Sequence, residues 1–108
     1  MLASRKNALK TFVRMLKERH KDEVEKIILF GSVARGDDRE NSNVDVLVIV
    51  KDDSFKMQRL ISEIVVDILL KTGVYISAKV LTLDEFNLLR RIGSSFYRSI
   101  SKEGIVVG

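Results

Sequence analysis

Cysteine, proline and tryptophan are absent from this sequence of 108 residues, and histidine occurs once, as His20. Without cysteine the chain forms no disulfide, binds no metal through thiolates and has no thiol nucleophile. A single histidine excludes histidine-rich zinc sites and argues against histidine-dependent catalytic triads. Any chemistry must therefore come from carboxylates, hydroxyls, cations or the backbone.

Long apolar runs are also missing. The longest, such as residues 46–50, are far shorter than the roughly 20 residues that a membrane-spanning helix needs. The N-terminus has no apolar stretch followed by a cleavage site. Hydrophobic residues make up 45% and charged residues 31% of the chain, which is typical of a folded globular domain. We therefore expect a single domain over residues 1–108, a cytoplasmic location and no membrane partner.

Positive charge is concentrated at the N-terminus. Residues 1–21 contain seven of the 19 Lys and Arg residues, and Glu18 is their one acid. Such a segment could bind nucleic acid, but apart from Phe12 no aromatic side chain lies among these cations, and Phe12 belongs to an apolar stripe. We therefore expect a solvated basic helix and consider nucleic-acid binding unlikely.

Hydrophobic periodicity indicates alternating helices and strands, which favours α/β or α+β layering. We expect a polar surface loop over 32–43 that can begin with one helical turn, a helix cap by Gly73 at a C-terminus, and a helix cap by Asp84 at an N-terminus. The first two strands should pair directly, while the helix after the second strand crosses over to the third. The expected helices are 4–20, 54–72, 84–91 and 95–102, and the expected strands are 25–30, 44–50, 75–83 and 105–107.

Two features point to chemistry. Gly31 and Ser32 follow the first strand, where a small backbone and a hydroxyl can approach a phosphate closely. Asp45 interrupts the apolar strand 44–50, and a carboxylate there is unfavourable unless it meets a metal or solvent. Each has a simpler interpretation, because Gly-Ser is a common turn and Asp45 can be an acid on an edge strand that faces water.

Together these features resemble the minimal nucleotidyltransferases of the DNA polymerase β superfamily. Those proteins carry Gly-Ser, a small residue and Ala-Arg-Gly, then a loop and an Asp-x-Asp strand, with a third acid on a later strand. The element order and the final residues 102–107 also look like that family's. The matching positions are Gly31, Ser32, Ala34, Arg35, Gly36, Ser42 and Asp45.

The resemblance implies an α/β (α+β) nucleotidyltransferase fold: a small mixed twisted sheet with helices mainly on one face, and the Gly-Ser and Asp45 site on the open side. It also implies two Mg²⁺ ions and a nucleoside triphosphate, with ATP as the expected donor and a protein hydroxyl as the acceptor of the nucleoside monophosphate. Such domains resemble antitoxins that pair with a small helical HEPN-type protein. Homo-oligomers stay open as well.

The sequence departs from the family at two of three acids. Asn43 stands where the first acid of the Asp-x-Asp pair is expected, so Asp45 is the remaining catalytic carboxylate. The third-acid position falls on Lys79 when the family's strand ending is read against residues 79–82, with Ser77 on the same face of that strand as the other choice. We therefore expect weak metal binding, through Asp45 and Asn43.

Three alternatives follow from these departures. Asp37 or Asp38 in the loop could lend a missing carboxylate. Arg35 could contact phosphate together with Gly31 and Ser32, or could instead brace the loop through ion pairs with the two loop acids. The protein as a whole is either a nucleotidyltransferase with an eroded metal site, or a catalytically inactive binding module that neutralises its helical partner by contact.

Overall fold

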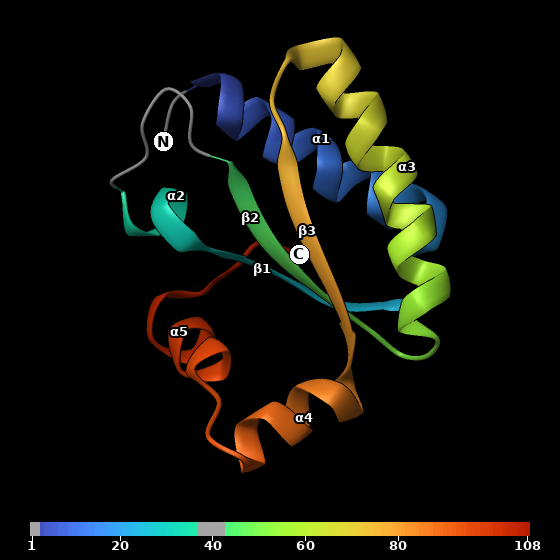
Figure 1. Cartoon of the computed structure of the whole chain (residues 1–108). Coiled ribbons are helices and arrows are strands. Elements are labelled where there is room, and N and C mark those ends of the chain that lie inside the picture. The colour runs from blue at the N-terminus through green and yellow to red at the C-terminus, as the bar shows by residue number, and fades with distance from the viewer. Residues whose placement is uncertain (1–2, 37–42) are drawn as a thin grey trace.

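The structure is a computed structural model that describes residues 3–36 and 43–108. Its four strands form one mixed sheet in the order β3-β2-β1-β4 (Figure 1). β1 pairs antiparallel with β2 and with β4, whereas β2 pairs parallel with β3. The elements are α1 (Ala3–His20), β1 (Val24–Phe30), α2 (Gly31–Arg35), β2 (Val44–Val50), α3 (Ser54–Thr72), β3 (Ile76–Thr82), α4 (Leu83–Arg91), α5 (Ser95–Glu103) and β4 (Ile105–Val106).

The predicted order of elements is confirmed, and so are the direct pairing of the first two strands and the crossover through α3. Gly73 ends α3 in the left-handed conformation, as predicted. The predicted N-terminal cap of α4 is wrong. Thr82 caps this helix, because its hydroxyl accepts a hydrogen bond from the Glu85 backbone N–H at 3.1 Å, and the Glu85 carboxylate accepts one from the Thr82 N–H at 2.8 Å. Asp84 lies in the first turn instead.

The side chains of β2 alternate between two cores. Val44, Val46, Val48 and Val50 pack with the apolar stripes of α1 and α3. Leu47 and Ile49 face the other way and pack with Ile100 of α5. The two long helices therefore cover one face of the sheet, as predicted, while the short α4 and α5 cover part of the opposite face (Figure 1).

The basic helix α1 is amphipathic. Leu9, Phe12 and Leu16 are buried against the sheet, while Lys6 and Lys10 are exposed, as expected of a solvated face. Arg5, which we expected on that solvated face, is buried, with 5% of its surface exposed. Among the helices of residues 3–36 and 43–108, none has the length and apolarity needed to cross a membrane.

Candidate functional site

The centre of the candidate site is a close approach between Gly31 and Asp45. The register of β1 and β2 places Phe30 opposite Asp45, so the next residue, Gly31, turns away beside the carboxylate. Gly31 has a φ of +77°, and a Cβ built on it would overlap the Asp45 Oδ2 atom. Both the backbone conformation and the space therefore require glycine at this position.

A short helix, α2, begins directly at Gly31 and fixes the residues after it. Val33 is buried and anchors this helix to the core that contains α1 and α3. Gly36 ends the helix in the left-handed conformation, and its N–H donates a hydrogen bond to the Val33 carbonyl at 3.2 Å. The helical turn that the sequence allowed is thus present. It contains the half-buried Ser32, which directly follows Gly31.

Asp45 lies on the face of the sheet opposite α1 and α3, and its side chain is half-buried. Burial raises the pKa of Asp45 above its ordinary value, while the positive charge of Arg35 acts in the opposite direction. Carboxylates whose pKa is perturbed by burial and by a specific charge are enriched at functional sites, so Asp45 is a candidate functional residue.

Arg35 is held by a residue that sequence analysis did not single out. Its Nη1 atom donates a hydrogen bond to Glu103 Oε2 at 3.0 Å, and the Glu103 side chain is 23% exposed. Glu103 is the last residue of α5, so this ion pair connects the C-terminal part of the chain to α2. Arg35 is thus braced by Glu103, whereas bracing by Asp37 or Asp38 falls outside the described residues, as does Ser42.

Ser77 and Lys79, the two candidates for the third-acid position, occupy different positions on β3 relative to Asp45. Ser77 is the register partner of Asp45, and Lys79 is the register partner of Leu47. The Lys79 ammonium lies 4.7 Å from the centre of the Phe96 ring, a cation–π contact with α5. Ser77 therefore neighbours the Asp45 carboxylate directly, while Lys79 is directed to an aromatic ring further along the sheet.

A magnesium ion needs oxygen ligands, and the described residues around Asp45 supply few charged ones. Asn43 is exposed and directly precedes β2, two residues before Asp45. Among residues 3–36 and 43–108, no three His, Cys, Asp or Glu side chains gather as a metal site. One carboxylate with an amide and a hydroxyl nearby fits an ion that arrives with nucleotide phosphates, because Mg²⁺ is commonly held by one or two carboxylates plus substrate phosphates. The same set of ligands is too small to bind a magnesium ion in the absence of nucleotide.

The family model for the nucleotidyltransferase domain matches residues 9–107. The chain belongs to this family. A protein of Methanocaldococcus jannaschii, provisionally named a protein adenylyltransferase, is 42% identical over 100 residues, which cover 93% of this chain and 94% of that protein. A second protein of that organism with the same kind of name is 36% identical over 74 residues, 66% of this chain and 50% of its own length. Family membership implies a nucleotide substrate and a divalent metal ion.

Solved structures share the fold. A provisionally named nucleotidyltransferase from Sulfolobus solfataricus aligns with a TM-score of 0.62 and 21% identity, covering 95% of this chain and 81% of that one. A toxin–antitoxin structure with AMP-PNP aligns with a TM-score of 0.59 and 18% identity, covering 97% and 72%. At these identities the likeness concerns the fold alone. It confirms the mixed α/β nucleotidyltransferase fold that the motif predicted.

Proposed function

We propose that this protein transfers AMP from magnesium-bound ATP to a hydroxyl group of a partner protein. The observation that carries the proposal is the contact between the Gly31 backbone and the Asp45 carboxylate, in a chain that belongs to the nucleotidyltransferase family. A protein hydroxyl as acceptor is supported by the name of the 42% identical relative, and ATP as donor by the AMP-PNP in the structural neighbour.

In this proposal the residues around Asp45 divide the work. The Gly31 and Ser32 backbone and the Ser32 hydroxyl bind the triphosphate, and Arg35 offsets its negative charge. Asp45 and Asn43 hold magnesium together with the phosphates, with Ser77 in the position of the third acid. Bound with the nucleotide, magnesium would neutralise phosphate charge and favour ionisation of the acceptor hydroxyl.

The transfer itself exchanges one phosphoryl bond for another. The acceptor oxygen bonds to the α-phosphorus, the bond from that phosphorus to the bridging oxygen breaks, and pyrophosphate leaves. The acceptor proton needs a base near the attacking oxygen. Asp45 is assigned this role because it is the carboxylate that lies against Gly31 at the start of α2.

The acceptor in this proposal belongs to a helical HEPN-type protein, and the chain acts as an antitoxin. Support comes from the toxin–antitoxin complexes among the structural neighbours, which share this fold at 16–18% identity. Cytoplasmic location, a single domain over residues 1–108 and the possibility of homo-oligomers stay predictions from the sequence.

A second function, a contact antitoxin without catalysis, is favoured by one observation. Among the described residues no three His, Cys, Asp or Glu side chains gather as a metal site, and Asn43 together with either Lys79 or Ser77 occupies the positions where the motif predicts the family's other acids. In that case the fold binds its partner and no nucleotide is transferred. The two functions differ in a measurable product.

Mass spectrometry of the co-expressed helical partner tests the proposal. We expect a mass increase of one AMP on a hydroxyl side chain, which is absent when Asp45→Asn replaces the wild type. Asp67→Asn is the matched control, because Asp67 is a half-exposed carboxylate on α3 outside the site. A partner that binds this protein but never carries AMP, with ATP and magnesium in excess, would instead establish the contact antitoxin.

A further inference from the structure

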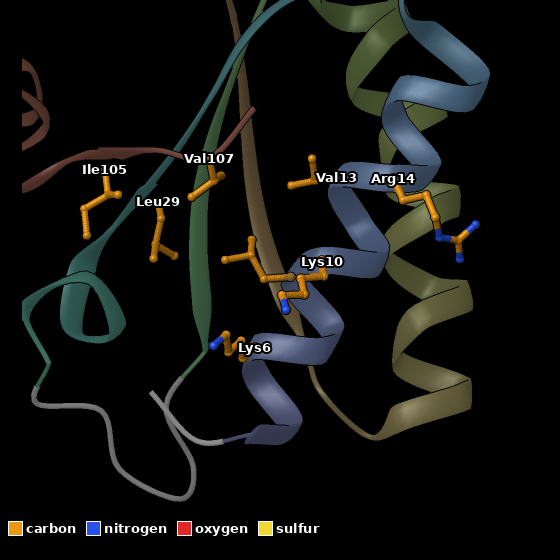
Figure 2. Close-up of a pocket in the computed structure, with 8 residues that line it drawn as sticks. Lys6, Lys10, Val13, Arg14, Leu29, Ile105 and Val107 are labelled. Carbon is orange, nitrogen blue, oxygen red and sulfur yellow. The ribbon is translucent and has the colours of Figure 1, made fainter.

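A groove lies between α1 and the β4 end of the sheet (Figure 2). Its volume is about 640 Å³. Pockets of about 300–1,000 Å³ are large enough to bury a drug-sized group, so this groove has room for more than one apolar side chain. Its apolar lining consists of Leu9 and Val13 from α1, Leu29 from β1, and Ile105 and Val107 from the C-terminal segment.

This groove opens on the face of the sheet opposite the proposed active site. Leu29 pairs in register with Ile105 and belongs to the core formed with α1 and α3. Asp45 faces the other side of the sheet, beside Leu47 of the smaller core. A partner bound in the groove therefore leaves the Asp45 site accessible, and the inference below does not depend on the proposed function.

Two lysines line the α1 side of the groove. Lys6 and Lys10 are one helical turn apart, both are exposed, and Figure 2 shows their side chains extending toward the strand side, where Leu29 and Ile105 lie. Arg14 also lines the groove, but its guanidinium points away from it and pairs with Glu18 at 3.2 Å. Among the described residues no acid lines the groove, so in this part of the chain its rim is cationic and its floor is apolar.

We propose that this groove docks an acidic amphipathic segment of a partner protein. Apolar side chains of the segment fill the space between α1 and Ile105, and its carboxylates face Lys6 and Lys10. An amphipathic helix with apolar side chains three or four residues apart suits such a groove, and acids beside those positions complement the lysines. The two lysines favour an acidic partner, because they would repel the positive charges of a basic one.

Two other occupants fit less well. Nucleic acid is held by many phosphate contacts and by stacking on aromatic side chains. Of the residues that the structure describes, two lysines are directed at the groove and no aromatic side chain lines it. A lipid bilayer would need a broad apolar surface, and the apolar part here is a concave floor beneath charged side chains. Both are included as competitors in the test.

The probe is a fluorescently labelled synthetic peptide that forms an amphipathic helix, with leucine along one face and glutamate at the other positions. The control peptide has the same sequence with every glutamate replaced by lysine. Fluorescence anisotropy measures binding to the whole chain. We expect the glutamate peptide to bind and the lysine peptide not to bind. Replacing Lys6 and Lys10 together by alanine should weaken binding about tenfold, since two exposed ion pairs are lost.

Matched variants test whether the peptide binds in the groove, and not merely to any positively charged or hydrophobic part of the surface. Lys17→Ala with Lys21→Ala removes the same charge outside the groove and should leave the affinity unchanged. Ile105→Ser should weaken binding about fivefold, as expected for partial loss of one apolar contact. Val106→Ser changes the neighbouring residue, which is 61% exposed and faces the other side of the sheet, and should have no effect. Thermal melts confirm that each variant is folded.

The proposal is overturned if the glutamate peptide fails to bind, or if both charge variants weaken it equally. It is also overturned if single-stranded DNA or phosphatidylglycerol vesicles bind more tightly than the peptide and lose affinity with the Lys6 and Lys10 substitutions. The proposal is supported if the glutamate peptide binds and if its affinity falls in the Lys6, Lys10 and Ile105 variants but not in the control variants.

Discussion

Asp45 is both a residue of an apolar strand and the carboxylate of the candidate site. It sits in a run of valines, leucine and isoleucine in β2, yet its carboxylate faces the site and not the core of α1 and α3. Burial raises its pKa while Arg35 lowers it, so the site holds this acid at a cost to the folded state. Such a cost is typical of functional positions, where stability is reduced in favour of chemistry.

Asp45→Asn should leave the melting temperature unchanged or raise it at pH 7 in magnesium-free buffer. The folded protein holds the Asp45 proton more tightly than the unfolded chain, so ionisation of Asp45 destabilises the fold as pH rises through the raised pKa. The difference between variant and wild type should disappear near pH 3, below the ordinary aspartate pKa of about 4. Thermal melts across this range measure it. A strong destabilisation at pH 7 would mean that Asp45 is a structural ion-pair partner.

Gly31→Ala should destabilise the fold more than Gly36→Ala. Both glycines have a positive φ, which costs an alanine about 1 kcal/mol or more. A Cβ at Gly36 meets no atom within 4 Å, whereas a Cβ at Gly31 overlaps the Asp45 carboxylate. Urea unfolding of the two variants isolates the contact with Asp45, and we expect about 1–3 kcal/mol of extra loss for Gly31→Ala. Equal losses would show that the carboxylate moves aside freely.

Free magnesium should bind weakly. Among residues 3–36 and 43–108 no three His, Cys, Asp or Glu side chains gather as a metal site, and neutral ligands replace the waters of Mg²⁺ poorly. Isothermal titration without nucleotide should give no stoichiometric site, whereas magnesium with ATP should bind and should depend on Asp45. A tight magnesium site in the free protein that is lost in Asp45→Ala would instead show that a complete ligand set is preformed.

At the scale of elements, α5 supports the site from a distance in sequence. Glu103 contacts Arg35 across 68 positions in the chain, and Phe96 contacts both Phe30 and Lys79. The last turn of α5 therefore fixes the guanidinium whose charge acts on Asp45. Glu103 is a positioning residue in this interpretation, because it acts on the site through Arg35.

Glu103→Gln should raise the KM for ATP about threefold while changing kcat less, because Arg35 is held less firmly and phosphates are bound less well. Lys102→Gln is the matched control, being the exposed neighbour on α5. Exchanging the two charges, with Arg35→Glu and Glu103→Arg, should not restore the KM, since the cation then stands at the wrong position. A wild-type KM in Glu103→Gln would show that the ion pair has no role in nucleotide binding.

Elements were predictable where their signal is local. The strand of residues 44–50 and the helix ended by Gly73 follow from periodicity and from one conformational requirement. We predicted the wrong cap for α4, Asp84, although Thr82 and Glu85 have the spacing of a capping box in the sequence. In contrast, the choice of Glu103 as partner of Arg35 depends on how α5 packs, which no local pattern reports.

At the scale of the whole molecule, the sheet separates two surfaces. The Gly31–Asp45 site lies on the side that α4 and α5 partly cover, and the cationic groove lies by α1 and β4 on the other side. The motif in the sequence named Gly31 and Asp45, which the structure brings together on the first surface. The groove was not predictable, because Leu29 and Ile105 meet only after β4 pairs with β1.

We propose that nucleotidyl transfer by this chain depends on Asp45, with Asn43 and Ser77 at the positions of two of the family's acids. Transfer of labelled AMP from ATP to the helical partner should therefore be compared in three proteins: wild type, Asp45→Asn, and Asn43→Asp combined with Ser77→Asp. Ser77 is chosen because it is the register partner of Asp45. We expect no transfer by Asp45→Asn, slow transfer by the wild type and faster transfer by the double variant. Transfer by Asp45→Asn at the wild-type rate would contradict the account.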